Sequence, residues 1–206
     1  MPATIETVRH EDQTTTEWTG GTSTQLAIYP TSSHYADRTF KWRLSSATVN
    51  LPESQFTPLP GYQRILMVLA GKLRIVHENR GEASLLPFEQ HAFDGGWTTT
   101  GFGRCVDFNL MMADGVTGNV QALEIRPGEQ REIPPSARSN SENQRQTLAI
   151  YVVNGDLSAR YGETSHALRP GDCFLVHESG ASVESLSLDS PRDGLGTRIV
   201  LSRITS

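Results

Sequence analysis

An arginine inside a strand-like segment is the first sign of chemistry in this sequence. Arg43 lies among aromatic, aliphatic and serine residues in the segment FKWRLSSATV, residues 40–49. A strand turns alternate side chains to opposite faces, so we expect Arg43 and Ser45 to point to the same side. A guanidinium inside a β-protein needs a partner, because an unpaired buried charge is costly. Its planar fork of N–H donors suits a carboxylate.

A second pair of polar residues lies in the segment RCVDFNLMM, residues 104–112. Alternation places Asp107 and Asn109 on one face and apolar residues on the other. Asn109 carries a donor and an acceptor and can bind an amide or formyl group, while Asp107 can hold an arginine in place. Thr24 is a further polar strand residue among the candidate ligand contacts. The alternative is that Arg43 and Asp107 only join two sheets.

An acid–base role for the same residues is the main alternative to simple binding. Asp107 or His91 can serve as the base of a cofactor-independent isomerase or lyase that acts on a small acid. A hydrolase is not indicated, because the chain has no GxSxG motif and neither Cys105 nor Cys173 stands in a Cys/His cluster. A third alternative is a dimerisation module without a ligand, so a homodimer stays open.

Short β-type segments must position these residues. Strand-favouring runs recur along the chain, separated by Gly, Pro and Asn-Gly, and no amphipathic helix of ten or more residues is indicated. Examples are the runs RILMVLAGKLRIV, TLAIYVVNGDLSARY and TRIVLSRIT. Many short strands at regular spacing predict an all-β fold, an antiparallel sandwich or barrel.

The strand pattern also repeats along the chain. VLAGKLRI aligns with VVNGDLSA at an offset of 84 residues, which places Gly71 against Gly155, and a proline shared by the two halves repeats at an offset of 83. This favours two copies of one β-unit over chance similarity of glycine hairpins. The expected parts are an N-terminal segment 1–16, a first unit 17–112 with the ligand pocket, a bridge 113–118 and a second unit 119–206.

Composition and charge limit the classes of partner. The 206 residues carry 18 Lys and Arg against 23 Asp and Glu, a net charge of −5 without long runs of one sign. Nucleic acid and acidic membranes are therefore not expected as partners. No signal peptide is indicated, and no apolar run approaches the roughly 18 residues of a membrane helix, so we expect a cytoplasmic protein.

Five ordered blocks in the first half resemble one known family. They are GGTSTQLAIYP (residues 20–30), FKWRLSSATV (40–49), PGYQRILMVLAG (60–71), LLPFEQHAFDG (85–95) and DFNLMM (107–112). In these blocks the chain resembles the HutD/Ves family of bicupins, whose genes often accompany histidine-utilisation enzymes. The resemblance implies two jelly-roll units in one chain. It also implies a binding or regulatory role in histidine catabolism, with N-formylglutamate as a suggested ligand.

Two departures from the family pattern bear on the site. The family usually has an acidic residue where Gln25 stands, and Asp-Arg where this chain has Gln63 followed by Arg64. A role that depends on a carboxylate at either position is therefore not expected here.

The chain lacks the metal ligands that cupin enzymes typically carry. Their motif of histidines and one glutamate, counted back from Gly71, places Arg64 at the glutamate position, and neither unit retains a ligand. The six histidines occur singly in the sequence, at positions 10, 34, 77, 91, 166 and 177. A cation in place of a carboxylate repels a metal, so we predict no metal and no cofactor.

Arg64 then becomes a second cation that can bind a carboxylate. Two cations, one anion and an amide suit a small acidic amino-acid derivative. We therefore expect a small carboxylate-bearing ligand, and the family resemblance implies that it resembles N-formylglutamate. The second unit is expected to be structural, because its last strand, RIVLSRIT, has no Asp-x-Asn pair. The predicted ligand-binding residues are Arg43, Ser45, Arg64, Asp107, Asn109 and Thr24.

Overall fold

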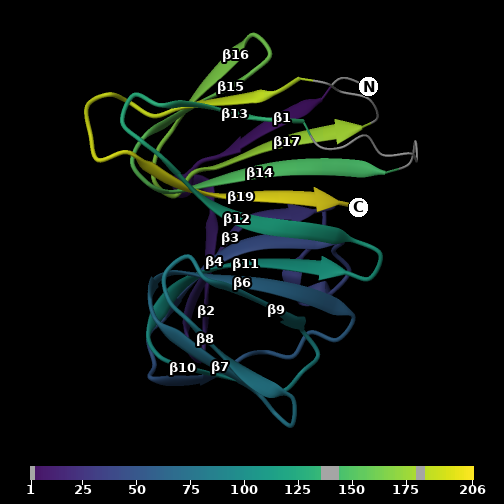
Figure 1. Cartoon of the computed structure of the whole chain (residues 1–206). Helices are drawn as coiled ribbons and strands as arrows, with labels where there is room; N and C mark the ends of the chain where they lie inside the picture. The colour runs from purple at the N-terminus through teal and green to yellow at the C-terminus, as the bar shows by residue number, and fades with distance from the viewer. Residues whose placement is uncertain (1–2, 136–143, 180–183) are drawn as a thin grey trace. The chain divides into compact units, whose positions relative to one another are not determined.

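The computed structural model describes residues 3–135, 144–179 and 184–206, and almost all of its regular structure is β-strand (Figure 1). The strands are β1 (Thr4–Val8), β2 (Thr14–Trp18), β3 (Gly21–Tyr29), β4 (Trp42–Val49), β5 (Glu53–Gln55), β6 (Tyr62–Gly71), β7 (Leu73–His77), β8 (Gly81–Leu85), β9 (Gln90–Asp94), β10 (Thr99–Phe102), β11 (Cys105–Ala113), β12 (Thr117–Ile125), β13 (Gln130–Ile133), β14 (Arg145–Asn154), β15 (Leu157–Tyr161), β16 (Thr164–Leu168), β17 (Cys173–Ser179), β18 (Leu186–Asp189) and β19 (Thr197–Thr205). Two short 3-10 turns, η1 (His10–Asp12) and η2 (Tyr35–Asp37), interrupt them. No helix in these ranges is long and apolar enough to cross a membrane.

The chain divides into two compact units. Gln13–Val116 forms one, called here the first unit, and Thr117–Ser206 forms the second together with the N-terminal residues up to Asp12. The first unit contains a six-stranded sheet, β2-β3-β4-β11-β6-β9, and a four-stranded sheet, β5-β10-β7-β8. The second contains a five-stranded sheet, β1-β17-β14-β19-β12, and a four-stranded sheet, β13-β18-β15-β16. All pairings are antiparallel, and the predicted all-β fold of two jelly-roll units is confirmed.

Strand order repeats between the units. The run β9-β6-β11-β4 of the first unit has the same order as β17-β14-β19-β12 of the second, and the two four-stranded sheets also correspond strand for strand. A β-bulge lies near the end of β6 and another at the same place in β14. Each is followed by a glycine at positive φ, Gly71 at 80° and Gly155 at 73°. A Cβ added at either glycine would overlap the backbone oxygen of the residue just before the neighbouring strand. Any other residue at this turn would therefore require the backbone to shift.

The N-terminal residues contribute to both units, which differs from the separate segment expected for residues 1–16. β1 pairs with β17, from Thr4 opposite His177 to Val8 opposite Cys173, as Figure 1 shows in purple and green. β2 pairs with β3. The polar, threonine-rich β2 has too little apolar surface to pack alone, but it can extend an existing sheet through backbone hydrogen bonds.

An ion pair holds the residues just after β1 against Asp172 of the second unit. Arg9 Nη1 lies 2.8 Å from Asp172 Oδ2, and the His10 backbone N–H donates to Asp172 Oδ1 at 2.9 Å. The Asp172 carboxylate also accepts from the Arg169 backbone N–H at 3.0 Å. These hydrogen bonds lower the pKa of Asp172 in spite of its burial. β1 is thus joined to the second unit at its edge by backbone pairing and by a buried carboxylate.

Candidate functional site

Three adjacent central strands of the first unit place the polar candidates on one face. In β4 and β11, Arg43 lies opposite Met111, and Ser45 lies opposite Asn109. On the other side of β11, Met111 lies opposite Arg64 of β6. Residues directly opposite each other on neighbouring strands share a face. The alternate residues of β4, including Trp42 and Leu44, are buried on the opposite face of the sheet.

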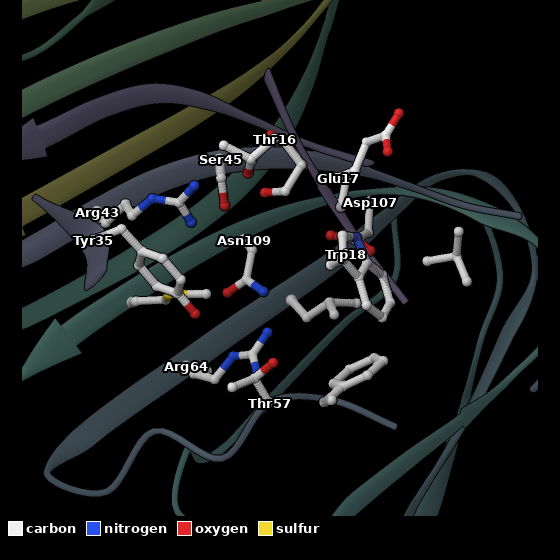
Figure 2. A pocket seen from close by; sticks show the side chains of 16 residues that line it. Thr16, Glu17, Trp18, Tyr35, Arg43, Ser45, Thr57, Arg64, Asp107 and Asn109 are labelled. Carbon is white, nitrogen blue, oxygen red and sulfur yellow. The ribbon is translucent and has the colours of Figure 1, made fainter. Parts of the chain in front are cut away.

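These side chains surround a cavity of about 340 Å³, near the lower end of the range for small-molecule sites. Figure 2 shows Arg43 and Arg64 entering from two sides, with their guanidinium groups turned towards Asn109 at the centre. The lining residues are Thr16, Glu17, Trp18, Ser23, Tyr35, Arg43, Ser45, Ala47, Val49, Phe56, Thr57, Arg64, Leu66, Asp107, Asn109 and Met111.

Arg43 is a buried cation without a carboxylate partner in the described parts of the chain. Its side chain is 4% exposed, and its Nε donates to Gln25 Oε1 at 3.0 Å. The guanidinium carbon lies 4.5 Å from the centre of the Tyr35 ring. Burial lowers the pKa of Arg43 to about 10, so the group stays charged at neutral pH. Gln25 therefore positions the guanidinium through a neutral carbonyl and leaves its charge available.

Arg64 is held between aromatic rings. Its guanidinium carbon lies 5.3 Å from the centre of the Phe56 ring and 5.1 Å from that of Phe93. Its Nε has no hydrogen-bond partner within residues 3–135, 144–179 and 184–206. Burial lowers the pKa of Arg64, and the nearby Asp107 carboxyl acts in the opposite direction. The ring faces favour a cation here but leave its N–H donors for another group.

Asp107 and Asn109 present acceptors to the same cavity. Their side chains are 3% and 4% exposed, and the Oδ1 atom of each is buried without a partner in the described chain. Burial raises the pKa of Asp107 to about 7, against the opposing effect of Arg64. No ion pair joins Asp107 to Arg43 or Arg64 within the described ranges, so the direct support expected from this carboxylate is not formed.

Thr24 is the one predicted site residue that does not line the cavity. It lies opposite Ser46, and its hydroxyl is 2.8 Å from that of Thr15 on the exposed side. Ser46 belongs to the face opposite Ser45, and a register shift between Gln25 and Ala27 follows in β3. Counting alternate residues from the end of β3 therefore assigns the wrong face, and the neighbouring Ser23 lines the cavity instead.

The sequence did not indicate the residues at the rim. Tyr35 comes from η2 between β3 and β4, and Thr57 comes from the segment after β5. Trp18 ends the edge strand β2, next to Glu17. Strand alternation says nothing about side chains in loops, so only the closeness of Tyr35 to Arg43 in the fold reveals its place.

Two histidines that stand apart in the sequence meet between the sheets of the first unit. His77 Nε2 of β7 lies 3.0 Å from His91 Nε2 of β9. His77 Nδ1 is 2.8 Å from Thr99 Oγ1, and that hydroxyl donates to the Trp97 carbonyl at 3.1 Å. The Thr99 oxygen is therefore free to accept from His77 Nδ1–H, so His77 Nε2 accepts from His91. Burial lowers the pKa of both imidazoles, which agrees with a neutral pair.

The donors do not fit the metal site of cupin enzymes. Within the residues that the structure describes, no three His, Cys, Asp or Glu side chains converge on one point. The cavity instead contains Arg43 and Arg64, whose positive charges oppose a second cation. The cavity of the first unit therefore carries two positive charges where the metal site of a cupin enzyme carries ligands for a cation.

Comparison with known families and curated proteins gives two matches. The sequence model of the family described as HutD matches residues 10–191. An uncharacterised 21.2 kDa protein from the hutC 3' region of Pseudomonas putida is 32% identical over 113 residues. That alignment covers 53% of this chain and 58% of the relative, so the chain spans little more than half of that protein's length.

Solved structures match nearly the whole chain. A conserved protein of unknown function from Pseudomonas aeruginosa PAO1 has a TM-score of 0.81 at 22% identity, with 98% of each chain covered. HutD from Pseudomonas fluorescens SBW25, solved in a formate condition, has a TM-score of 0.72 at 20% identity, again with 98% of each chain covered. At these identities the structural matches establish the fold, and the two-unit architecture is shared along the full chain.

Proposed function

The chain belongs to the HutD family of histidine-utilisation-associated, cupin-like proteins, and on this premise we propose that it binds a small carboxylate-bearing metabolite in the cavity of the first unit. The ligand we propose resembles N-formylglutamate. Binding it would make the protein a regulator of histidine or amino-acid catabolism.

The observation that carries the proposal is a pair of buried arginines, Arg43 and Arg64, that form no ion pair with a carboxylate of the described residues. Arg43 uses one N–H on Gln25, and Arg64 Nε has no partner in the described chain. Two cations removed from water have lost their hydration and gain strongly from an anion. A ligand carboxylate supplies that anion, and charge-assisted bonds to guanidinium groups are among the strongest hydrogen bonds in proteins.

The walls of the cavity suit a compact and partly apolar ligand. Leu66, Ala47 and Met111 line the cavity beside the polar groups, and the aromatic side chains of Tyr35 and Phe56 line it as well. A few fixed polar groups in a mainly apolar wall are typical of metabolite sites. N-formylglutamate combines two carboxylates with a short carbon chain and one amide, so it matches two arginines and Asn109.

A cofactor-independent isomerase or lyase in the same cavity is the second candidate function. The observation that favours it is Asp107, a buried carboxyl whose pKa is raised to about 7. A base with a pKa near the working pH is the most effective at moving a proton. Here Asp107 would remove a proton from a small acid that the arginines hold.

Calorimetric titration with N-formylglutamate, glutamate and urocanate tests the proposal. We expect at least one ligand to bind, and Arg43→Ala to weaken that binding by about 10- to 100-fold, the range expected for a lost hydrogen bond between charged groups. Arg74→Ala is the matched control, because Arg74 is in the same unit but exposed and paired with Glu82. No binding, or equal loss in both variants, contradicts the proposal.

Proton NMR of the same mixtures separates the two candidate functions. A bound ligand that stays chemically unchanged after long incubation supports binding alone. Conversion that depends on Asp107 and disappears in Asp107→Asn supports the isomerase or lyase.

A further inference from the structure

At one end of the cavity the protein presents hydrogen-bond acceptors. A ligand carboxylate cannot pair with them, because it offers no donor. Arg43 and Arg64 offer donors, whereas Asp107 and Asn109 each place a buried Oδ1 in the cavity without a donor from the described residues. The Ser46 hydroxyl donates to the backbone carbonyl of Asp107 at 3.0 Å rather than to its carboxyl group. The Oδ1 atoms of Asp107 and Asn109 thus lack a donor among residues 3–135, 144–179 and 184–206.

Strand geometry aims these two acceptors in the same direction. Asp107 and Asn109 are two residues apart on β11, so their side chains leave the same face of the sheet. Arg64 of the neighbouring strand β6 lies opposite Met111, which is the next residue after Asn109 on that face. Figure 2 shows Asn109 between the arginines and Asp107 further along, next to Trp18. A ligand anchored on the arginines therefore extends along β11 towards both acceptors.

The geometry points to a second subsite, in which Asp107 and Asn109 accept a hydrogen bond from an amide N–H of the ligand whose carboxylates lie on Arg43 and Arg64. This inference rests on the proposed function and defines its ligand class as N-acylated acidic amino acids. Diacids without nitrogen fill the arginine end but leave the two acceptors unpaired.

Charge favours a neutral amide over a free ammonium group at this subsite. Arg43 and Arg64 lie close enough to act on each other electrostatically, and Arg64 also acts on Asp107. An ammonium group at this subsite would be repelled by Arg64, and Asp107 would attract it only in its ionised form, which burial disfavours. An N-acylated diacid brings two negative charges to two arginines, whereas free glutamate brings a net charge of only one.

A matched series of ligands tests the inference by calorimetry on the full chain. Glutarate has both carboxylates on the same five-carbon chain as N-formylglutamate but no nitrogen. We expect the wild-type protein to bind N-formylglutamate about tenfold or more tightly than glutarate, and more tightly than glutamate. N-formyl-N-methylglutamate, which keeps the acyl group but has no N–H, should lose the same advantage.

Variants assign the preference to the two acceptors. In Asp107→Ile with Asn109→Leu, the preference should shrink to about twofold while glutarate still binds, since such substitutions remove the acceptors and keep the arginines. Asp107→Asn keeps an oxygen acceptor and should retain most of the preference. Asp114→Asn, at an exposed site beyond the cavity, should change nothing. Circular dichroism and tryptophan fluorescence confirm that each variant is folded.

Different outcomes overturn different statements. Equal binding of glutarate and N-formylglutamate, or a preference that survives in the double variant, overturns the amide subsite and leaves the arginine site standing. Tighter binding of glutamate than of N-formylglutamate overturns the preference for a neutral amide. A lack of binding by every ligand removes the proposed function and this inference together.

Discussion

The central strands of the two units present different side chains at matching positions. Aligned on the shared bulge and on Gly71 and Gly155, the strand pairings match three polar residues of the first unit with three aliphatic residues of the second: Arg64 with Leu148, Asp107 with Ile199, and Asn109 with Leu201. All three aliphatic residues are buried in one continuous apolar core. The first unit has a cavity where the second unit is filled.

This difference shows what the fold requires and what it tolerates. The second unit closes the same strand order with leucine, isoleucine and valine, so the jelly roll does not need polar groups at these positions. Buried polar groups without partners lower stability. Arg64, Asp107 and Asn109 have no polar counterpart at the matching positions of the second unit, which indicates that they serve a purpose other than folding. We continue to propose a structural role for the second unit.

Fluorescence allows the two interiors to be compared in one molecule. All three tryptophans, Trp18, Trp42 and Trp97, lie in the first unit. Tryptophan emission therefore follows the unfolding of that unit, while far-UV circular dichroism follows strands of both.

The largest effect is expected from placing the first unit's arginine in the second. Leu148→Arg puts an unpaired charge into a filled core and should lower the free energy of unfolding by about 3–5 kcal/mol. Denaturant titration followed by circular dichroism measures it. Leu195→Arg is the control, because Leu195 is fully exposed and should change stability by less than about 0.5 kcal/mol. Equal stability of the two variants would mean that the second unit can open a cavity as the first does.

The next effect concerns Asp107 and depends on pH. Its pKa is raised from 3.8 to about 7, so the folded state binds more protons than the unfolded state between these values, and stability falls as pH rises through them. Asp107→Asn has no ionisable group at this position, so its stability does not fall with pH for this reason. Relative to the wild type, the variant should gain about 2–4 kcal/mol between pH 4 and pH 8. Tryptophan-detected urea titrations at the two pH values measure the gain, and a constant difference would show that Asp107 is solvated in the fold.

A smaller effect tests what the units have in common. Gly71→Ala and Gly155→Ala each force a Cβ against backbone at positive φ and should cost similar amounts, about 2 kcal/mol or more. Gly61→Ala is the control, since Gly61 has the same φ of 80° as Gly71 but open space around its Cα. It should cost only about 1 kcal/mol. Clearly unequal costs at Gly71 and Gly155 would argue against matching the units at this turn.

The smallest effect is expected from the histidine pair, where the second unit has Tyr161 in place of His77. The pKa of His77 and that of His91 are lowered, so the stability of the pair is present above about pH 6.5 and is lost as pH falls through the folded-state pKa values. Between pH 7 and pH 5, the wild type should therefore lose about 0.5–1 kcal/mol more unfolding free energy than His77→Tyr, the amount expected for one hydrogen bond. Tryptophan-detected melting at pH 7 and pH 5 measures it, with His34→Gln as an exposed control.

Local patterns were enough to predict much of the fold and part of the site. Alternation in β4 and β11 depends only on neighbouring residues, so the shared faces of Arg43 with Ser45 and of Asp107 with Asn109 follow from the sequence. The offset between Gly71 and Gly155 likewise survives in the strand pairings.

Features that depend on register or on distant strands could not be predicted in this way. Thr24 was predicted as a ligand contact only because it is a polar strand residue, and its pairing with Ser46 places it on the face away from the cavity. His77 and His91 belong to different sheets, and no sequence spacing shows that they touch. Tyr35 comes from a loop, and the absence of an ion pair at Asp107 depends on distances across the cavity. Each of these properties arises from packing rather than from local periodicity.

The pairing of β1 with β17 has a consequence for synthesis on the ribosome. The partner of β1 emerges about 165 residues after β1 itself. At roughly 5–20 residues per second, about ten to thirty seconds pass before the two can join. In that interval all strands from β2 to β11 become available, so the first unit can complete its sheets while β1 still has unpaired backbone groups. β1 is thus made well before the strand with which it pairs, and a substitution that weakens this pairing would act late in the folding of the second unit.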